Sequence, residues 1–464
     1  MRADHQMRMF LVFFRFITVL AIGTAFAYAQ QNLILRTTPG KGAAVEFKYG
    51  LAVVHNLSSS GDVALVTAGD ATATQLFLTL AQGDPWIQSV EPDVEKELDE
   101  SDASSKAANS TASGAVDPLV AGSSDLVNYF GSLVRDGYAN QPSAAVIHIP
   151  GAQTAFGVGS GIVAVIDTGI DPGHPALAGN VVAGYDFINN VAGVPSDLAN
   201  LNGSTVAFLD QMGQPQTAGA QTPFVLNGYA LTMLDGSTVA FLDGSTVAFL
   251  DQTNLGEAFG HGTMVSGLIH LVAPGAKIMP LRAFQNDGTG NMSDIVRAIY
   301  YATDNGAKVI NMSFSSTSAS PALAAAIQYA RAHKVITVAA AGNSGTGVTV
   351  YPAGCGAIGV ASINAAGLRS FFSNYGDSDA RTSAPGEALL TTYPGGGYVG
   401  VWGTSFSAAL VSGTAAILGQ VAPRASQGDF SDALEHGKKL TSYGSIGGAS
   451  LDVLAVLQGY KADD

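Results

Sequence analysis

The sequence predicts an α/β protein built around a doubly wound parallel sheet, preceded by a small α+β domain. Continuous apolar runs at 162–166, 277–281, 309–312 and 335–340 have the pattern of parallel strands that are buried on both faces. Stretches with helical spacing, at 264–272, 293–305 and 321–333, alternate with these runs. In such sheets, functional sites gather at the carboxyl ends of the strands.

The composition fits a large folded chain and excludes one class of partner. The chain has 464 residues, enough for two or three domains, and contains 56 glycines but only 12% charged residues. Its net charge of −15 and the lack of Lys/Arg runs argue against nucleic acid as a partner.

Residues 1–29 are expected to be a signal peptide. Arg2 and Arg8 precede an apolar core at 16–27, and Ala27-Tyr28-Ala29 matches the small-x-small cleavage pattern. The alternative is a membrane anchor, which Arg15 disfavours because it interrupts the apolar region. Since no later stretch predicts a membrane span, we expect a secreted protein, extracellular or periplasmic.

The single cysteine, Cys355, excludes an intrachain disulfide. Its surroundings, Tyr351-Pro352-Ala353-Gly354, predict a small packed residue more than a nucleophile.

A small domain is predicted over residues 30–98. Its expected strands are 33–35, 63–66 and 87–90, and its expected helix is 72–82, with Leu76, Phe77 and Leu80 as the apolar face. Residues 99–123 are rich in Ser, Ala and charge without periodicity, which predicts a flexible linker.

The main domain is expected at 124–464, with an insertion at 198–256. The insertion repeats Gly-Ser-Thr-Val-Ala-Phe-Leu-Asp at 203–210, 236–243 and 244–251, with a degraded copy at 228–235. Alternating side chains and Asp-Gly turn signals predict an antiparallel meander. The insertion either has no function or covers a cleft or binds a partner.

Ser405 is the first candidate for chemistry. It lies in Gly403-Thr404-Ser405, directly before a long apolar helix at 408–421. Unpaired N–H groups at a helix start stabilise an anion, although a serine there is most often only a helix cap.

Three further motifs supply the groups that a nucleophilic serine needs. Asp167 ends an apolar strand, His261 stands between two glycines before a helix, and Asn343 follows another strand in Ala-Gly-Asn. An imidazole takes the proton of the hydroxyl, a carboxylate orients the imidazole, and amide donors stabilise the oxyanion. Read singly, these residues are a turn aspartate, a structural histidine and a loop asparagine.

Together the motifs resemble the subtilisin-like serine proteases. The four signature blocks match Asp-Thr-Gly-Ile-Asp at 167–171, Gly-His-Gly-Thr at 260–263, Ala-Gly-Asn at 341–343 and Gly-Thr-Ser at 403–405. The order Asp…His…Ser is that of subtilisin. Residues 33–95 resemble the family's I9-type inhibitory propeptide, including the closing Val-Glu-Pro-Asp.

The resemblance implies a subtilisin-like fold behind a ferredoxin-like propeptide, and a secreted endopeptidase made as a self-processing zymogen that its own propeptide inhibits. It implies protein or peptide substrates bound as an extended strand between two edges. The matching residues are Gly288, Thr289 and Gly290 on one edge and Ser313, Phe314 and Ser315 on the other, with Val350 at the floor of the specificity pocket. No cofactor is expected for catalysis. Structural Ca²⁺ is common in the family, but no ligands can be assigned.

Three positions depart from the family pattern. Ala409 stands where proline is usual, Phe406 where methionine is usual, and Ser315 where glycine is usual. None of them removes a catalytic atom. Phe406 leaves no thioether beside the nucleophile, so the site should resist peroxide.

Two other functions use the same residues. A binding protein could retain the fold and use the insertion as its contact surface, but it would not need all four active residues together. An esterase could use the same machinery, although recognition along strand edges favours peptides.

Overall fold

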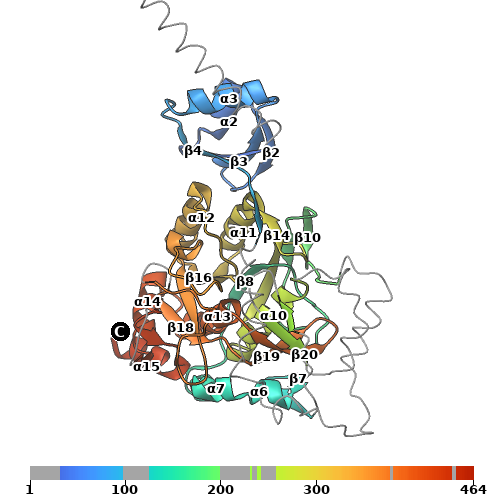
Figure 1. Cartoon of the computed structure of the whole chain (residues 1–464), viewed down its shortest axis with the longest axis vertical. Coiled ribbons are helices and arrows are strands. Elements are labelled where there is room, and N and C mark those ends of the chain that lie inside the picture. The colour runs from blue at the N-terminus through green and yellow to red at the C-terminus, as the bar shows by residue number, and fades with distance from the viewer. Residues whose placement is uncertain are drawn as a thin grey trace, which may run out of the picture. The chain divides into compact units, whose positions relative to one another are not determined.

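The computed structural model describes residues 32–97, 125–198, 230–232, 238–241, 258–376, 380–440 and 446–463. The predicted signal peptide, the linker at 99–123 and the repeat copies at 203–210 and 244–251 lie outside these residues. The chain divides into two compact units (Figure 1), with the division between Val94 and Glu95 and with Ser320–Ala322 assigned to the first unit. The predicted end of the small domain, residue 98, lies outside the described residues and stays a prediction.

The first unit is a four-stranded antiparallel sheet with two helices. Its elements are β1 (Leu33–Thr37), α2 (Gly42–Tyr49), β2 (Ala52–Asn56), β3 (Val63–Thr67), α3 (Ala71–Ala81) and β4 (Ile87–Pro92). The strands lie in the order β2-β3-β1-β4. Leu35, Val45, Val66 and Phe77 belong to its apolar core.

The predicted apolar face of α3 is wrong at two of its three residues. Phe77 is buried, but the side chains of Leu76 and Leu80 are 58% and 49% exposed. The buried residues are Thr74, Phe77 and Ala81, which follow the i, i+3, i+7 spacing of one helix face. Leu76 and Leu80 share the neighbouring face and so remain in solvent.

Helix α2 and strand β2 were not predicted. In α2 only Gly42 and Val45 are buried, while Phe47 is 92% exposed. Of these two apolar side chains of α2, Val45 packs into the core and Phe47 remains in solvent.

The second unit contains the large sheet and its helices. Its elements are β5 (Glu95–Glu97), β6 (Leu126–Tyr129), β7 (Ser132–Arg135), α6 (Asp136–Ala139), α7 (Pro142–Val146), α8 (Ile149–Phe156), β8 (Ile162–Asp167), β9 (Gly184–Asp186), β10 (Val191–Gly193), β11 (Ala230–Thr232), β12 (Thr238–Phe241), α10 (His261–Val272), β13 (Lys277–Arg282), β14 (Thr289–Asn291), α11 (Met292–Asp304), β15 (Ala307–Met312), α12 (Pro321–Ala332), β16 (Ile336–Ala340), η2 (Ala353–Cys355), β17 (Ile358–Ile363), β18 (Thr382–Pro385), β19 (Leu389–Tyr393), β20 (Gly397–Trp402), α13 (Thr404–Val421), α14 (Gln427–Leu434), β21 (Lys438–Lys439), β22 (Ala449–Ser450) and α15 (Val453–Asp463).

The described strands of the large sheet lie in the order β10-β9-β13-β8-β15-β16-β17-β18-β22-β21. From β9 to β22 the neighbouring strands are parallel, and only the edge strands β10 and β21 pair antiparallel. The predicted parallel sheet is thus observed, and β8 lies near its middle. Side chains at the carboxyl end of β8 therefore have neighbours on both sides.

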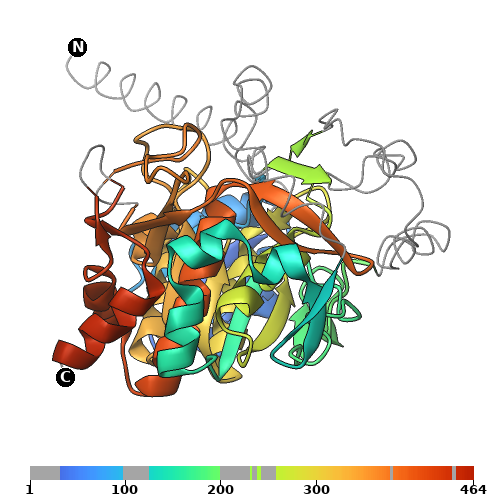
Figure 2. The same cartoon turned by 90° about the horizontal axis from the view of Figure 1, so that it is seen from below.

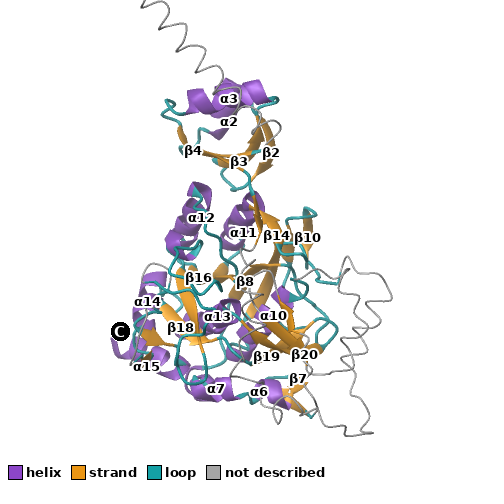
Figure 3. Ribbon diagram, in the orientation of Figure 1, coloured by secondary structure: helices purple, strands orange, loops and turns teal. Residues whose placement is uncertain are grey.

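Helices cover both faces of this sheet. Figures 1 and 3 show α10 and α13 on one face and α11 and α12 on the other. On the outside, α15 packs against α8 and α14 (Figure 2). Among the described helices, α13 alone is long and apolar enough to span a membrane, but 83% of it is buried inside the protein. Gly413 lets α13 approach α10, because an added Cβ would lie 2.6 Å from that of Val272.

Two strands of the insertion extend a second, antiparallel sheet. β11 pairs with β12, β12 pairs with β20, and β20 pairs with β19. The degraded repeat and one full copy thus form the antiparallel pair that their sequences predict. The copy at 236–243 lies beside β20, the strand that leads directly into Ser405.

Candidate active site

Asp167 is the last residue of β8 and is almost fully buried. Its carbonyl accepts a hydrogen bond of 3.0 Å from Ala283 N, which ties it to the end of β13. Its Oδ1 accepts a bond of 2.8 Å from Thr168 N. The carboxylate is therefore held in a fixed orientation at the carboxyl edge of the sheet.

His261 is the first residue of α10, and its imidazole lies against Asp167. Nδ1 of His261 lies 2.8 Å from Oδ1 and 2.9 Å from Oδ2 of Asp167, with both side chains buried. Gly262 makes this approach possible, because an added Cβ would lie 2.1 Å from the carbonyl oxygen of Gly169. A carboxylate on Nδ1 leaves Nε2 as the nitrogen that can exchange a proton.

Ser405 is the second residue of α13, a helix that packs against α10. Gly403 before the helix has φ 153° and ψ 156°, a conformation that is open essentially to glycine alone. The Ser405 hydroxyl donates to the carbonyl of Ser313 at 3.0 Å, and the Ser313 hydroxyl donates back to the Ser405 carbonyl at 2.8 Å. The ring of Phe406 lies 5.6 Å from that of His261, centroid to centroid.

Asn343 follows β16 and is fixed by the start of α13. Its Oδ1 accepts hydrogen bonds from the backbone N–H of Thr404 at 2.8 Å and from the Thr404 hydroxyl at 2.9 Å. The same hydroxyl accepts from Gly342 N at 3.1 Å. With its oxygen held in this way, the amide of Asn343 directs Nδ2 away from Thr404.

Sequence reasoning missed Thr404 and Asp197 as parts of this site. Thr404 lies inside the Gly-Thr-Ser motif at 403–405, so its hydroxyl could have been considered as a partner of Asn343. Asp197 carries no local signal, because the hydroxyls that bond to it belong to Thr168 and Thr263, 29 and 66 residues away in the chain.

One predicted substrate edge is paired in the structure. β14 contains Thr289 and Gly290 and pairs antiparallel with β5, with Gly290 opposite Lys96. Gly288 precedes this strand with φ 86°. The edge thus accepts an extended segment of the chain itself.

The other predicted substrate residues lie at the ends of β15 and near η2. The carbonyl of Ser313 accepts the hydrogen bond from the Ser405 hydroxyl, and Phe314 packs against Phe284 with ring centroids 4.9 Å apart. Ser315 is buried. Val350 is also buried, and its carbonyl accepts from Gly354 N at 2.8 Å. Its place at the floor of a specificity pocket stays a prediction.

The described residues do not fit a metal site made of acidic, histidine or cysteine side chains. Within them, no three such side chains are grouped so that they could hold an ion. We therefore assign no Ca²⁺ ligands.

Comparison with known proteins decides the family. The family model described as the subtilase family (peptidase S8) matches residues 159–449, which include all four motifs. The chain belongs to the subtilase family.

Relatives of this subtilase include named proteinases. Thermitase from Thermoactinomyces vulgaris is 34% identical over 272 residues, covering 56% of the chain and 75% of thermitase. A thermophilic serine proteinase from Bacillus sp. (strain AK1) is 33% identical over 257 residues, covering 55% of the chain and 51% of that proteinase. The chain thus matches only about half the length of the Bacillus relative.

A solved structure shows a similar fold. Fervidolysin from Fervidobacterium pennivorans, described as a keratinolytic enzyme related to subtilisin, superposes with a TM-score of 0.62 at 22% identity. The superposition covers 92% of this subtilase and 61% of fervidolysin.

Proposed function

We propose that the chain is a secreted serine endopeptidase, made as a zymogen that processes itself and is inhibited by its own N-terminal domain. The observation that carries the proposal is the buried pair of Asp167 and His261, 2.8 Å apart, with His261 on a helix, α10, that packs against α13, the helix that begins with Thr404 and Ser405. Membership of the subtilase family supports it independently.

In this mechanism Ser405 is the nucleophile. His261 takes the hydroxyl proton through Nε2 as Oγ attacks the scissile carbonyl, and later gives the proton to the leaving amine. Asp167 keeps the other ring nitrogen protonated and stabilises the imidazolium.

The oxyanion is stabilised by two donors that the structure prepares in advance. The backbone N–H of Ser405 lies in the first turn of α13, where the helix dipole favours negative charge. The Nδ2 group of Asn343 is the second donor, and the bonds from Thr404 to its Oδ1 fix its direction.

The N-terminal part of the chain supports the zymogen proposal in two ways. The order β1-α2-β2-β3-α3-β4 is that of ferredoxin-like domains. Directly after it, β5 pairs with β14 as an added strand, in the manner of a bound peptide. The segment that follows the small domain therefore pairs with the edge that we propose for the substrate.

Secretion is supported by the composition of residues 1–29, with a positive start, an apolar core and a small-x-small site. Mass spectrometry of the purified mature protein tests both this cleavage and the processing bond.

Self-processing is tested with the Ser405→Ala variant, expressed in a host or cell-free system without other active proteases. We expect the unprocessed chain to accumulate, whereas the wild-type chain matures and cleaves casein faster than a short-chain ester. Maturation of the variant at the wild-type rate would contradict self-cleavage.

Inhibition is tested by adding N-terminal fragments to the mature enzyme. A fragment of residues 32–97 should inhibit casein cleavage, and one of residues 32–94, which lacks β5, should inhibit much less. Equal inhibition by both fragments would show that β5 does not occupy the substrate edge.

A further inference from the structure

Asp197 lies beside the loop that follows Asp167, although no motif marks it. Its backbone N–H donates to Ile170 O at 3.0 Å, and Ile170 N donates to Pro195 O at 3.1 Å. Its side chain is 1% exposed. A buried carboxylate must be matched by donors.

Two threonine hydroxyls supply those donors, one from each catalytic segment. Thr168, the residue after Asp167, donates to Oδ1 of Asp197 at 3.0 Å. Thr263, two residues after His261, donates to Oδ2. The carboxylate thus bonds both segments at once.

Each of these hydroxyls also accepts a backbone N–H from the opposite segment. Gly262 N donates to Thr168 Oγ1 at 3.1 Å, and Asp171 N donates to Thr263 Oγ1 at 2.7 Å. With an N–H on the oxygen, the proton of each hydroxyl is directed at Asp197. A carboxylate accepts a hydrogen bond from both hydroxyls. A protonated carboxyl group or an amide instead points a hydrogen of its own at one of the two hydroxyls.

We propose that ionised Asp197 is a positioning residue, which clamps the loop after Asp167 to the start of α10 and so holds His261 in register. Its negative charge also stabilises the His261 imidazolium. This inference rests on the proposed protease mechanism, in which His261 is the base.

Other titratable groups face this carboxyl. Burial raises the pKa of Asp197 to about 6, and the negative charge of Asp167 adds to the rise. The hydroxyls of Thr263 and Thr168 and the guanidinium of Arg282 act against the rise. Tyr393 interacts with Asp197, and burial raises the pKa of this phenol, which stays neutral. Asp197 is therefore ionised at neutral pH, and the clamp loses one acceptor as the pH falls through about 6.

The test is the Asp197→Asn variant, with the titration of His261 followed by NMR in the full-length, ¹⁵N-histidine-labelled chain that also carries Ser405→Ala to prevent self-processing. Loss of a nearby negative charge should lower the imidazole pKa by about half to one unit. The acidic limb of kcat/KM should move to lower pH by a similar amount, and kcat on the plateau should fall about tenfold because the base is less well held.

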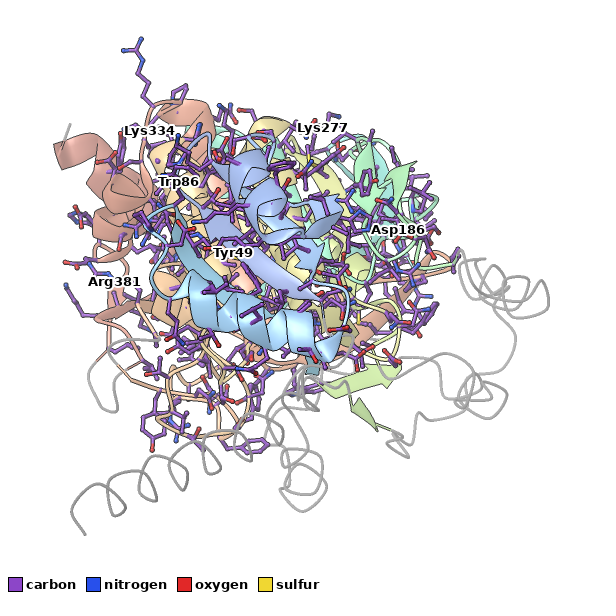
Figure 4. All side chains as sticks on the ribbon, turned by 90° about the horizontal axis from the view of Figure 1, so that it is seen from above. Tyr49, Trp86, Asp186, Lys277, Lys334 and Arg381 are labelled. Atoms are coloured by element: carbon purple, nitrogen blue, oxygen red, sulfur yellow. The ribbon has the colours of Figure 1, made fainter. Side chains whose placement is uncertain are left out.

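Asp186→Asn is the matched control. It removes another buried carboxylate of the same sheet, labelled in Figure 4, at the end of β9 next to the edge strand β10. This carboxylate pairs with Arg282 but accepts from neither threonine. It should leave the His261 pKa unchanged. Thr168→Val should reproduce part of the Asp197→Asn shift, and Thr168→Ser should restore the wild-type value.

An unchanged His261 pKa in Asp197→Asn, with or without a lower melting temperature, would overturn the proposal. The NMR measurement does not depend on turnover. An inactive wild-type chain would therefore contradict the protease function, while the pKa comparison would still decide whether Asp197 acts on His261.

Discussion

At the scale of single residues, Asn343 works through both ends of its amide. Its oxygen is held by Thr404, and its nitrogen is the proposed oxyanion donor. Because the oxyanion exists only after attack, Asn343→Ala should lower kcat and leave KM nearly unchanged. We expect kcat to fall about 10²–10³-fold, which is the range known for removal of one oxyanion donor in subtilisin. Steady-state kinetics on a peptide substrate measures it, and an equal rise in KM would contradict this role.

Thr404 should act only through Asn343 and Gly342. Thr404→Val removes the hydroxyl that bonds both residues, so Asn343 loses one of the contacts that orient it. We expect kcat to fall about tenfold, less than in Asn343→Ala. Thr404→Ser retains the hydroxyl and should keep most of the activity. A loss in Thr404→Ser as large as in Thr404→Val would show that packing, and not the hydroxyl, matters.

At the scale of elements, the tandem repeats allow a test of β12. The copies at 236–243 and 244–251 are identical, so deletion of either leaves the same eight residues to pair with β20. This deletion should change Tm by less than about 2 °C. Deletion of 228–251 removes β11 and β12, leaves the edge of β20 unpaired, and should lower Tm and promote aggregation.

Thermal melts and light scattering of the two deletion variants provide the measurement. If the single-copy deletion lowers Tm as far as the longer one, the copies are not interchangeable partners of β20.

The sequence could predict those elements whose signals are local. The strands of the parallel sheet are continuous apolar runs, and the residues of the candidate site lie in short motifs. The pairing of β5 could not be predicted, because Glu95–Glu97 has no apolar alternation and its partner lies far along the chain. The position of Asp197 likewise depends on tertiary contacts. The buried face of α3 was misassigned because Leu76 and Phe77 belong to different faces of an apolar helix.

At the scale of the whole molecule, two buried histidines should make stability depend on pH. His174 bonds Gly397 O through Nε2, and His270 bonds Asn180 through Nδ1. Burial lowers the pKa of each from 6.5 to about 4. The unfolded chain therefore binds protons below pH 6.5 that the folded chain does not bind until about pH 4.

The contribution of these histidines is complete above pH 6.5 and is lost as the pH falls from 6.5 to 4, with a loss of up to about 3 kcal/mol per histidine. The pKa of Asp197 is raised on folding, so this carboxyl stabilises the folded state as the pH falls from about 6 to 4, opposite to the effect of the histidines. His270→Gln should therefore lose less stability than the wild type between pH 7 and pH 4.5, as measured by urea unfolding of the Ser405→Ala chain. An equal loss in both would contradict the role of His270.

The central claim is that the chain activates the hydroxyl of Ser405 through His261 and Asp167. The most direct measurement is labelling of the matured protein with a fluorophosphonate, followed by mass spectrometric mapping of the modified residue. We predict a single label on Ser405 that is lost in Ser405→Ala and strongly slowed in His261→Ala, when the N-terminal domain of both variants has been removed by an added protease. Casein cleavage by a protein that carries no label at Ser405, or labelling that is unaffected by His261→Ala, would contradict the account.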